Sequence, residues 1–439
     1  MITVLNPQLS LKKYPPFVYV VETLLEVSGL IYRLVNRTPC DLAFQYNSGN
    51  IPGVKFVQEV KSYEKIVPFL TGEKTVNLPI VETEAEKFLN KCKRIFPHEW
   101  MYFSKWPCSS PFAVGLSHDV DRIRYYSWSN VLRLWFNRKL NLDINKTIYY
   151  LTHPYQDPYF QIENLALQEL NRGVTSTFFF LTVPRDSHGR RYKVKTLSPK
   201  LAELSSMNFE IGLHASIKSK KSVKKLNREK EILQKIVKNK INGVRYHYLM
   251  KNDNFLVFPD LAGFLYDSSL SSSKIWTIPR GVTYPHQPWC GFLNRKLQIR
   301  EIVLTVHDMA LINGYSFNPQ FISRIIKAGG LLTVLWHQRF MASPFENFTR
   351  QYWDIVDWGK REKGWFATLS EIVNFCNCRK SILFVPDKDI LRSYFKIDDL
   401  DLNQSLSLSS PRLKGKGSVK KITPGKFRLN LHSGDVLKW

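Results

Sequence analysis

Hydrophobic positions in the first part of the chain follow helical and strand spacing in turn. Apolar residues between 15 and 30 recur at intervals of three and four, which predicts an amphipathic helix. Residues 32–35 and 42–46 have the composition of short strands, and residues 83–93 show helical periodicity again. We therefore expect a small α/β domain over residues 1–110.

A different organisation begins after the Pro- and Ser-rich segment that precedes residue 111. Apolar strands are predicted at residues 112–116, 176–183, 210–213, 243–248, 302–306 and 331–336. Helices are predicted between them, at residues 125–140, 201–206, 223–238 and 317–328. Such alternation of apolar strands and helices is typical of an α/β fold with a parallel sheet or barrel. We assign residues 111–378 to this domain and residues 379–439, rich in Ser, Lys and Gly over 405–421, to a basic, partly disordered tail.

The net positive charge of the chain is compatible with several kinds of anionic partner and does not select one of them. The 439 residues carry a formal net charge of +26, which favours contact with nucleic acid, anionic lipid or acidic polysaccharide. Basic residues are densest over 218–240 and in the C-terminal tail, and a solvated basic face explains them equally well. Zinc-finger spacing, RNA-binding motifs and a leucine zipper are absent, so nucleic acid is the least favoured partner.

Cysteine usage and hydropathy bear on the compartment. The six cysteines form no repeating framework, which suits a reduced cytosol. The N-terminus lacks the basic start and apolar run of a signal peptide, and no stretch approaches the roughly 18 apolar residues of a transmembrane helix. These observations predict a cytoplasmic protein without a transmembrane segment, or one held peripherally on a membrane through its charge.

The first candidate for chemistry is the segment Ser117-His118-Asp119-Val120-Asp121, directly after an apolar strand. Residues two apart in an extended segment share a face, so Asp119 and Asp121 converge on one point. Two carboxylates that close repel each other unless a cation or a raised pKa relieves them. One carboxylate as a metal ligand and the other as a base fits this pair. A helix N-cap or turn, where Asp is common, is the alternative.

Three further strands end in side chains suited to the same site, namely His214, the alternating pair Arg245 and His247, and His337. Imidazole is a usual nitrogen ligand of zinc, Arg orients carboxylates, and His suits acid or base catalysis. Each residue alone fits a structural role as well, as a packed His or a salt-bridged Arg. Because α/β barrels carry their chemistry at the ends of strands, the ordered set favours one composite site.

In this order the motifs resemble those of the polysaccharide deacetylase (NodB-homology) family. The Asp-x-Asp segment is similar to the first motif, in which an Asp base precedes an Asp ligand, and residues 210–216 are similar to the His-containing second. Residues 244–251 and 335–337 are similar to the Arg-containing third motif and the final Leu-x-His motif. The resemblance implies a distorted (β/α) barrel that binds a divalent metal, zinc above all, and removes acetyl groups from a carbohydrate.

The chain departs from the family pattern at one ligand. A second His normally follows the first by four residues, but here that position is Lys218, which cannot ligate while protonated. His247 and His118 are the candidates to replace it. With His247 chosen, the expected metal ligands are Asp121, His214 and His247.

The resemblance implies the other roles as well. Asp119 acts as base, Arg245 steadies it and His337 protonates the leaving amine, although the two aspartates could exchange roles. Residues 266–269 and 279–281 resemble two loops of a family branch with an extra N-terminal domain. Candidate substrate-binding residues at these loops and at the final motif are Asp267, Arg280 and Trp336.

Four functions remain open at this point. A metal-dependent carbohydrate deacetylase, serving surface polysaccharide metabolism, accounts for the acid, the base and the orienting Arg together. A catalytically degenerate barrel that binds anionic glycan or lipid is favoured by Lys218. Hydrolysis of another C–N bond in a small molecule and nucleic-acid binding through the tail complete the set.

Overall fold

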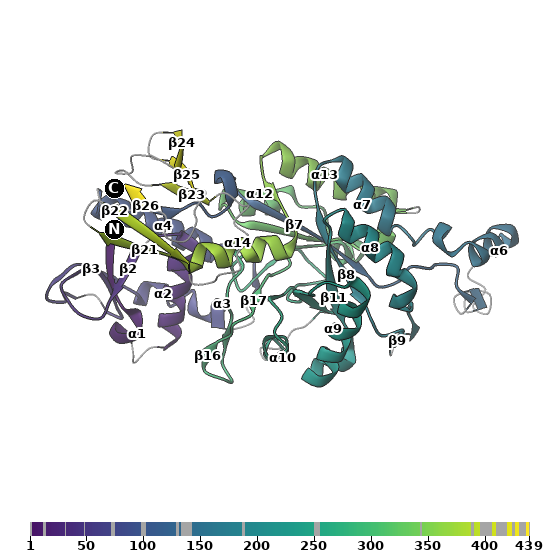
Figure 1. Ribbon diagram of the computed structural model, residues 1–439, viewed down its shortest axis with the longest axis horizontal. Coiled ribbons are helices and arrows are strands. Elements are labelled where there is room, and N and C mark those ends of the chain that lie inside the picture. The colour runs from purple at the N-terminus through teal and green to yellow at the C-terminus, as the bar shows by residue number, and fades with distance from the viewer. Residues whose placement is uncertain are drawn as a thin grey trace.

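The structure is a computed structural model. It describes residues 2–11, 15–30, 32–47, 49–71, 75–97, 102–128, 131–132, 143–186, 189–249, 255–342, 345–387, 390–395, 406–409, 419–423, 426–429 and 436–438. The purple N-terminal elements and the yellow C-terminal strands lie at one end of the molecule, and helix α6 lies at the other (Figure 1).

The N-terminal unit is a parallel sheet packed against helices. Its strands are β1 (Ile2–Leu5), β2 (Tyr32–Val35), β3 (Cys40–Gln45) and β4 (Val54–Glu59), in the order β2-β1-β3-β4. The helices are α1 (Pro7–Ser10), α2 (Pro15–Ser28), α3 (Val67–Thr71) and α4 (Ile80–Ile95). The apolar side of α2 is buried, including Val20, Val21 and Leu24, as its periodicity predicts.

The central sheet is a parallel, incompletely closed barrel in the order β17-β13-β12-β11-β8-β7-β19-β18, with β20 also paired to β7. Its strands are β7 (Ala113–Val120), β8 (Ser176–Leu181), β11 (Glu210–Ala215), β12 (Gly243–Tyr246), β13 (Tyr266–Asp267), β17 (Arg300–Glu301), β18 (Val306–His307), β19 (Leu331–Leu335) and β20 (Trp365–Phe366). The helices around it are α7 (Ile162–Asn171), α8 (Ser198–Ser206), α9 (Val223–Val237), α10 (Val257–Leu261), α11 (Asp308–Ile312), α12 (Pro319–Lys327), α13 (Glu346–Arg361) and α14 (Leu369–Ser381). The predicted α/β fold with a distorted barrel is therefore confirmed.

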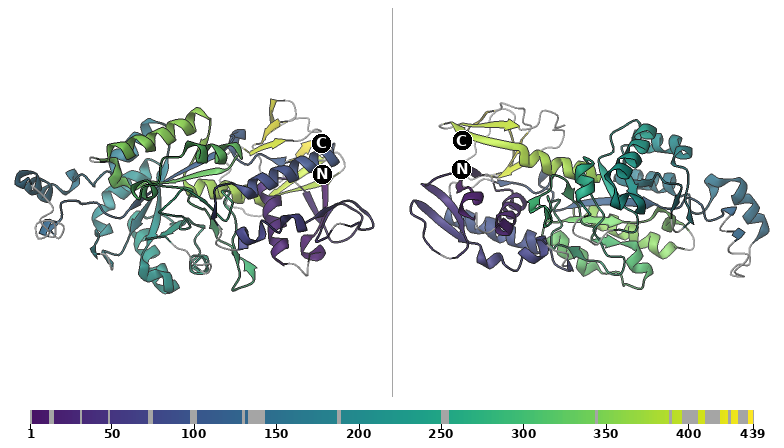
Figure 2. Two further views of the ribbon diagram at one scale, coloured as in Figure 1. Left: turned by 180° about the vertical axis from the view of Figure 1, so that it is seen from behind. Right: turned by 90° about the horizontal axis from the view of Figure 1, so that it is seen from below.

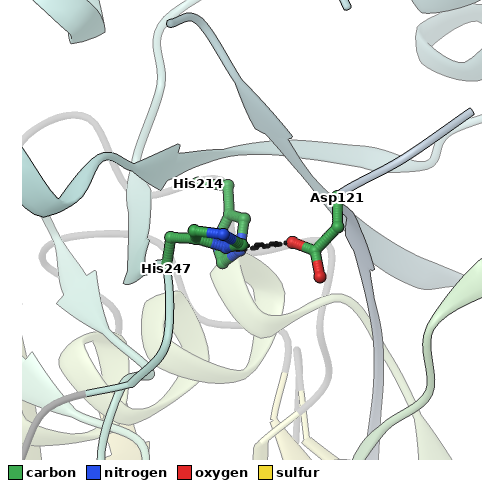
Figure 3. A group of neighbouring side chains, drawn as sticks. All are labelled: Asp121, His214 and His247. Atoms are coloured by element: carbon green, nitrogen blue, oxygen red, sulfur yellow. Dashed lines mark hydrogen bonds and ion pairs between the residues drawn. The ribbon is translucent and has the colours of Figure 1, made fainter. Parts of the chain in front are cut away.

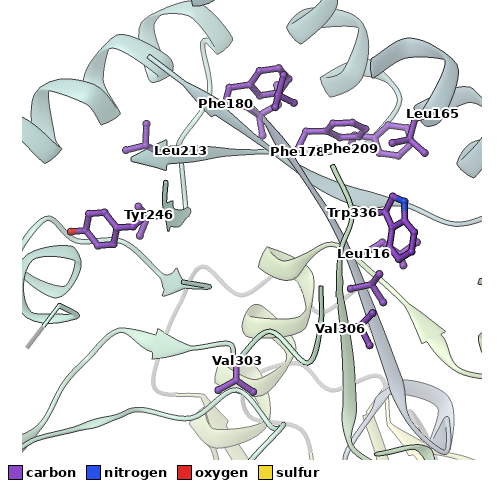
Figure 4. Close-up of a cluster of buried hydrophobic side chains, with 14 of the residues drawn as sticks. Leu116, Leu165, Phe178, Phe180, Phe209, Leu213, Tyr246, Val303, Val306 and Trp336 are labelled. Carbon is purple, nitrogen blue, oxygen red and sulfur yellow. The ribbon is translucent and has the colours of Figure 1, made fainter. Parts of the chain in front are cut away.

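Apolar side chains of the strands and the surrounding helices form the barrel's main core. Phe178 and Phe180 of β8 and Phe209, directly before β11, lie among them, with Trp336 beyond the end of β19 (Figure 4). Strands buried on both faces need nearly continuous apolar sequence, which explains runs such as that of residues 176–181.

A second core joins the N-terminal unit to the barrel. Residues of α2 and α4 share it with Tyr266 of β13 and with Leu369 and Ile372 of α14. At its edge, β5 (Thr75–Val76) pairs antiparallel with β14 (Ile278–Pro279). The short strands β15 (Trp289–Cys290) and β16 (Arg295–Lys296) form a hairpin nearby.

Residues 302–306 were expected to form one strand, and that prediction is wrong. Residues 300–301 belong to β17 and residues 306–307 to β18, which are the two ends of the sheet. In the connecting segment the backbone N–H of Ile302 donates to the carbonyl of Asp267, while that of Thr305 donates to Thr333 Oγ1. These residues therefore span the gap in the barrel instead of continuing either strand.

The segment after residue 378, expected to be a basic and partly disordered tail, contains strands where the structure describes it. Strands β23 (Leu406–Ser409), β24 (Val419–Thr423) and β25 (Lys426–Leu429) form an antiparallel sheet with β6 (Tyr102–Phe103). Strands β21 (Ile382–Asp387), β22 (Ile390–Phe395) and β26 (Val436–Lys438) form another. Alternating apolar residues, as in Leu-Ser-Leu-Ser, supply strand periodicity that the Ser, Lys and Gly content of the segment obscures.

Two observations complete the description. The helix expected at 125–140 lies mostly outside the described residues. In the part of the chain that the structure covers, every helix is too short or too polar to cross a bilayer.

Candidate active site

The candidate residues meet at the carboxyl ends of neighbouring barrel strands. Asp119 and Asp121 come from the end of β7, His214 from β11 and His337 from the segment that follows β19. Parallel strands deliver their carboxyl ends to the same edge of a sheet, so residues more than 200 positions apart become neighbours. All four side chains are buried.

Asp121, His214 and His247 form a compact triangle of potential ligand atoms (Figure 3). Asp121 Oδ1 lies 3.1 Å from His214 Nε2 and 3.0 Å from His247 Nδ1, and the two nitrogens are 2.9 Å apart. Ligand atoms about 2.1 Å from a shared metal ion are separated by about 3.0–3.4 Å at octahedral or tetrahedral angles. One carboxylate and two imidazoles are a donor set that zinc and similar ions use. These residues therefore fit a divalent metal.

Backbone contacts hold the His214 ring in the orientation that a ligand needs. His214 Nδ1 lies 3.0 Å from the carbonyl oxygen of Arg245 and donates to it, which directs Nε2 toward Asp121. Glu229 of α9 accepts hydrogen bonds from the backbone N–H and hydroxyl of Ser216, at 2.9 and 2.5 Å. The amphipathic helix α9 thereby fixes the loop directly after β11.

Asp119 is held by Arg245. Arg245 Nη1 donates to Asp119 Oδ1 at 2.8 Å, while Nη2 donates to Ser117 Oγ at 3.0 Å and Nε to the carbonyl of Ser268 at 2.8 Å. Burial alone would raise the pKa of Asp119, but the Arg245 guanidinium, aided by His214, holds that pKa below its ordinary value. Asp119 is therefore ionised, and its Oδ2 lies 3.7 Å from His214 Nε2.

Burial and hydrogen bonding also have opposite effects on the pKa of Asp121. Burial again would raise its pKa, but hydrogen bonds from His214, His247 and His337 hold the pKa well below the ordinary value. An anionic carboxylate is the form that a metal ion requires.

His337 carries the opposite charge. Its Nδ1 lies 2.9 Å from both carboxylate oxygens of Asp308, and its Nε2 lies 3.3 Å from Asp121 Oδ2. Burial alone would lower the pKa of His337, but Asp308 outweighs it and raises the pKa to about 9. The site therefore combines an ionised Asp119 with a protonated His337.

Sequence reasoning missed Asp308 and Arg339. Asp308 begins α11 immediately after β18, so a polar residue following a strand was the signal that could have found it. Arg339 Nη1 donates to Asp121 Oδ2 at 3.2 Å from the short 3₁₀ helix Gln338–Met341, which gives no periodic signal.

The structure selects between the two proposed replacements for the missing second His. His118 points away from the triangle: its Nδ1 contacts the carbonyl of Trp336 at 2.7 Å and its Nε2 contacts Glu169 at 2.9 Å. Lys218 is exposed on the 3₁₀ helix Ile217–Lys221. His247 is therefore the residue that supplies the second nitrogen to the group.

The three candidate substrate-binding residues are not brought to this group. Trp336 is fully buried and packs 5.5 Å from Tyr352, measured between ring centroids. Asp267 accepts from the backbone N–H and hydroxyl of Ser269, and burial raises its pKa to about 8. Arg280 Nε pairs with Glu301 at 2.7 Å beside the N-terminal unit. All three side chains are buried, and their contact with substrate stays a prediction.

Comparison with known proteins gives similarity to solved structures alone. No protein-family model and no curated protein matches the chain. A protein from Mycobacterium smegmatis described as a polysaccharide deacetylase matches with 17% identity and a TM-score of 0.43, over 64% of this chain and 96% of its own. PuuE allantoinase matches with 13% identity and a TM-score of 0.42, over 62% and 92%. A polysaccharide deacetylase from Pseudomonas aeruginosa PAO1 matches with 14% identity and a TM-score of 0.41, over 62% and 92%.

Proposed function

We propose that the chain is a metal-dependent hydrolase that removes an acetyl group from a carbohydrate. The observation that carries the proposal is the joint arrangement of a ligand triangle, an ionised carboxylate and a protonated imidazole within one buried group. Asp121, His214 and His247 would hold the metal, and three protein ligands leave positions open for water and substrate. When bound, a divalent cation supplies Lewis acidity that polarises a carbonyl and acidifies water.

The remaining residues supply the proton transfers. Asp119, kept anionic by Arg245, accepts a proton as water attacks the acetyl carbonyl carbon. His337, kept protonated by Asp308, donates a proton to the leaving nitrogen or oxygen as its bond to the acetyl carbon breaks. The products are acetate and the free amino or hydroxyl group of the sugar. The paired pKa directions of Asp119 and His337 support this division of roles.

The proposal is tested by acetate release from a panel of N- and O-acetylated sugars and of small amides that are not sugars. The protein loaded with zinc, cobalt or nickel should release acetate from at least one sugar, and Asp119→Asn should not. Turnover of small amides without turnover of any sugar would replace the carbohydrate assignment with a small-molecule amidohydrolase. Metal binding without turnover of any compound would favour a binding protein.

A further inference from the structure

A polypeptide arm leaves the barrel directly after Asp121 and returns at α7. We define the arm as residues 122–157, of which 122–128, 131–132 and 143–157 are described. Its helix α6 (Ile144–Thr152) stands away from the barrel in all three views (Figures 1 and 2). Asp157 anchors its base by accepting from the backbone N–H groups of Tyr125 and Tyr126 at 2.7 and 2.8 Å.

The arm exposes apolar side chains that a helix on a protein surface normally buries. Ile144 and Ile148 are four residues apart, share one face of α6, and are 71% and 56% exposed. Trp128 is 70% exposed on the outgoing limb. Six of the 18 large apolar side chains exposed in the described residues lie in the arm, so the exposure is concentrated there: Trp128, Leu132, Ile144, Ile148, Tyr149 and Tyr155. Such a concentration marks an interaction surface.

Aromatic residues also cluster within the arm and at its base. Tyr126 stacks on Tyr150 with ring centroids 4.8 Å apart, Tyr125 contacts Tyr159 at 5.3 Å, and exposed Tyr149 stacks on His153. Tyr and Trp place an apolar ring in hydrocarbon and a polar group in water, and therefore collect at membrane interfaces.

The positive charge of the arm favours an anionic lipid surface over a second copy of the chain as the partner of its apolar side chains. Its sequence contains six basic residues and two acidic residues, Asp143 and Asp157, and Arg124 and Lys146 are among the described basic ones. A second copy of this chain would bring an equally basic arm and be repelled. A surface of anionic lipid offers both hydrocarbon for the isoleucines and negative charge for the basic groups.

We propose that the arm docks the protein peripherally onto an anionic lipid bilayer. Ile144, Ile148 and Trp128 enter the headgroup boundary, the tyrosines lie at its level, and the basic side chains contact the lipid phosphates.

The test is co-sedimentation of the full chain with vesicles of phosphatidylcholine, with and without phosphatidylglycerol. The wild type should bind only the vesicles that contain phosphatidylglycerol, and binding should weaken as salt is added. Ile144→Ser/Ile148→Ser should weaken that binding by about tenfold or more, because apolar area is lost from the lipid. The matched control is Leu261→Ser/Phe292→Ser, which changes two exposed residues outside the arm and should bind as wild type does.

Three results would overturn the proposal. They are no binding to anionic vesicles, an equal loss of vesicle binding in the arm and control variants, and dimers in light scattering that depend on the arm. Equal thermal unfolding of the variants excludes misfolding as the cause of weakened binding. Because vesicle binding does not require turnover, failure of the proposed hydrolase activity leaves this test intact.

Discussion

His337 and Asp308 form a buried pair in which Nδ1 of the imidazole lies 2.9 Å from each carboxylate oxygen. The backbone N–H of His337 also donates to Asp308, at 2.5 Å. The two contacts fix the ring, and the Asp308 carboxylate raises the pKa of His337, which supports the proposal that its Nε2 donates a proton.

Asp308→Asn should move the alkaline limit of activity to lower pH. His337 must be protonated to act as acid, so activity falls as pH rises through its pKa of about 9. Asp308 is the main group that raises this pKa, and Asn removes the charge while keeping similar shape. The pH dependence of kcat/KM for both proteins measures the shift. An unchanged alkaline limit would contradict the assignment of His337 as acid.

Asp119→Asn should lower activity without loss of bound metal, and so distinguish the proposed base from the proposed metal ligands. The amide cannot accept the proton, so kcat should fall by about 10²–10⁴-fold. Bound metal should be retained, because Asp119 lies outside the ligand triangle. Asp121→Asn is the paired variant and should lose metal. Metal loss in Asp119→Asn together with metal retention in Asp121→Asn would show that Asp119 is the ligand and Asp121 the base.

Arg245→Met should destabilise the fold more than the double variant Arg245→Met/Asp119→Asn. Removing the guanidinium leaves Asp119 as an uncompensated buried charge, which costs about 3–5 kcal/mol of unfolding free energy. The double variant also removes that charge, so its cost should be smaller. Denaturant titration of the wild type, Arg245→Met, Asp119→Asn and the double variant measures the difference. Additive losses would show that the two side chains are not coupled.

Glu82 of α4 should stabilise the contact between the N-terminal unit and the barrel. Its Oε1 accepts from the backbone N–H groups of Thr283 and Tyr284, at 2.6 and 2.7 Å, and from the Thr283 hydroxyl at 2.7 Å. Glu82→Leu leaves these buried donors without an acceptor and should cost about 1–3 kcal/mol or more. Exposed Glu86→Leu on the same helix is the control in thermal unfolding. Equal melting temperatures of the Glu82→Leu and Glu86→Leu variants would show that Glu82 does not stabilise this contact.

Periodicity predicted most of the barrel because its strands are buried on both faces. The run at residues 176–181 and the amphipathic α9 give strong local signals. The short strands β17 and β18 do not, because two residues cannot show a period and their neighbours span a gap that exists only in the folded sheet. In the tail, the strand Leu406–Ser409 was not predicted, because the Ser, Lys and Gly content of residues 405–421 outweighed the alternation of its sequence.

Alternation along the strands explains which site residues could be predicted. Asp119 and Asp121, like Arg245 and His247, are two apart, and one strand places both members at the site. The same rule places Trp336, adjacent to His337, on the opposite side, where it packs against Tyr352. Arg280 pairs with Glu301 in the interior through a contact that local sequence does not encode.

The most direct test of the central claim is the metal content of the purified chain after exposure to zinc and removal of unbound ions. Wild type and Lys218→Ala should each hold about one ion per chain, whereas His247→Ala should hold none or nearly none. This result is expected because His247 lies 3.0 Å from Asp121 while Lys218 is exposed. Metal-free wild type, or full metal content in His247→Ala, would contradict the account.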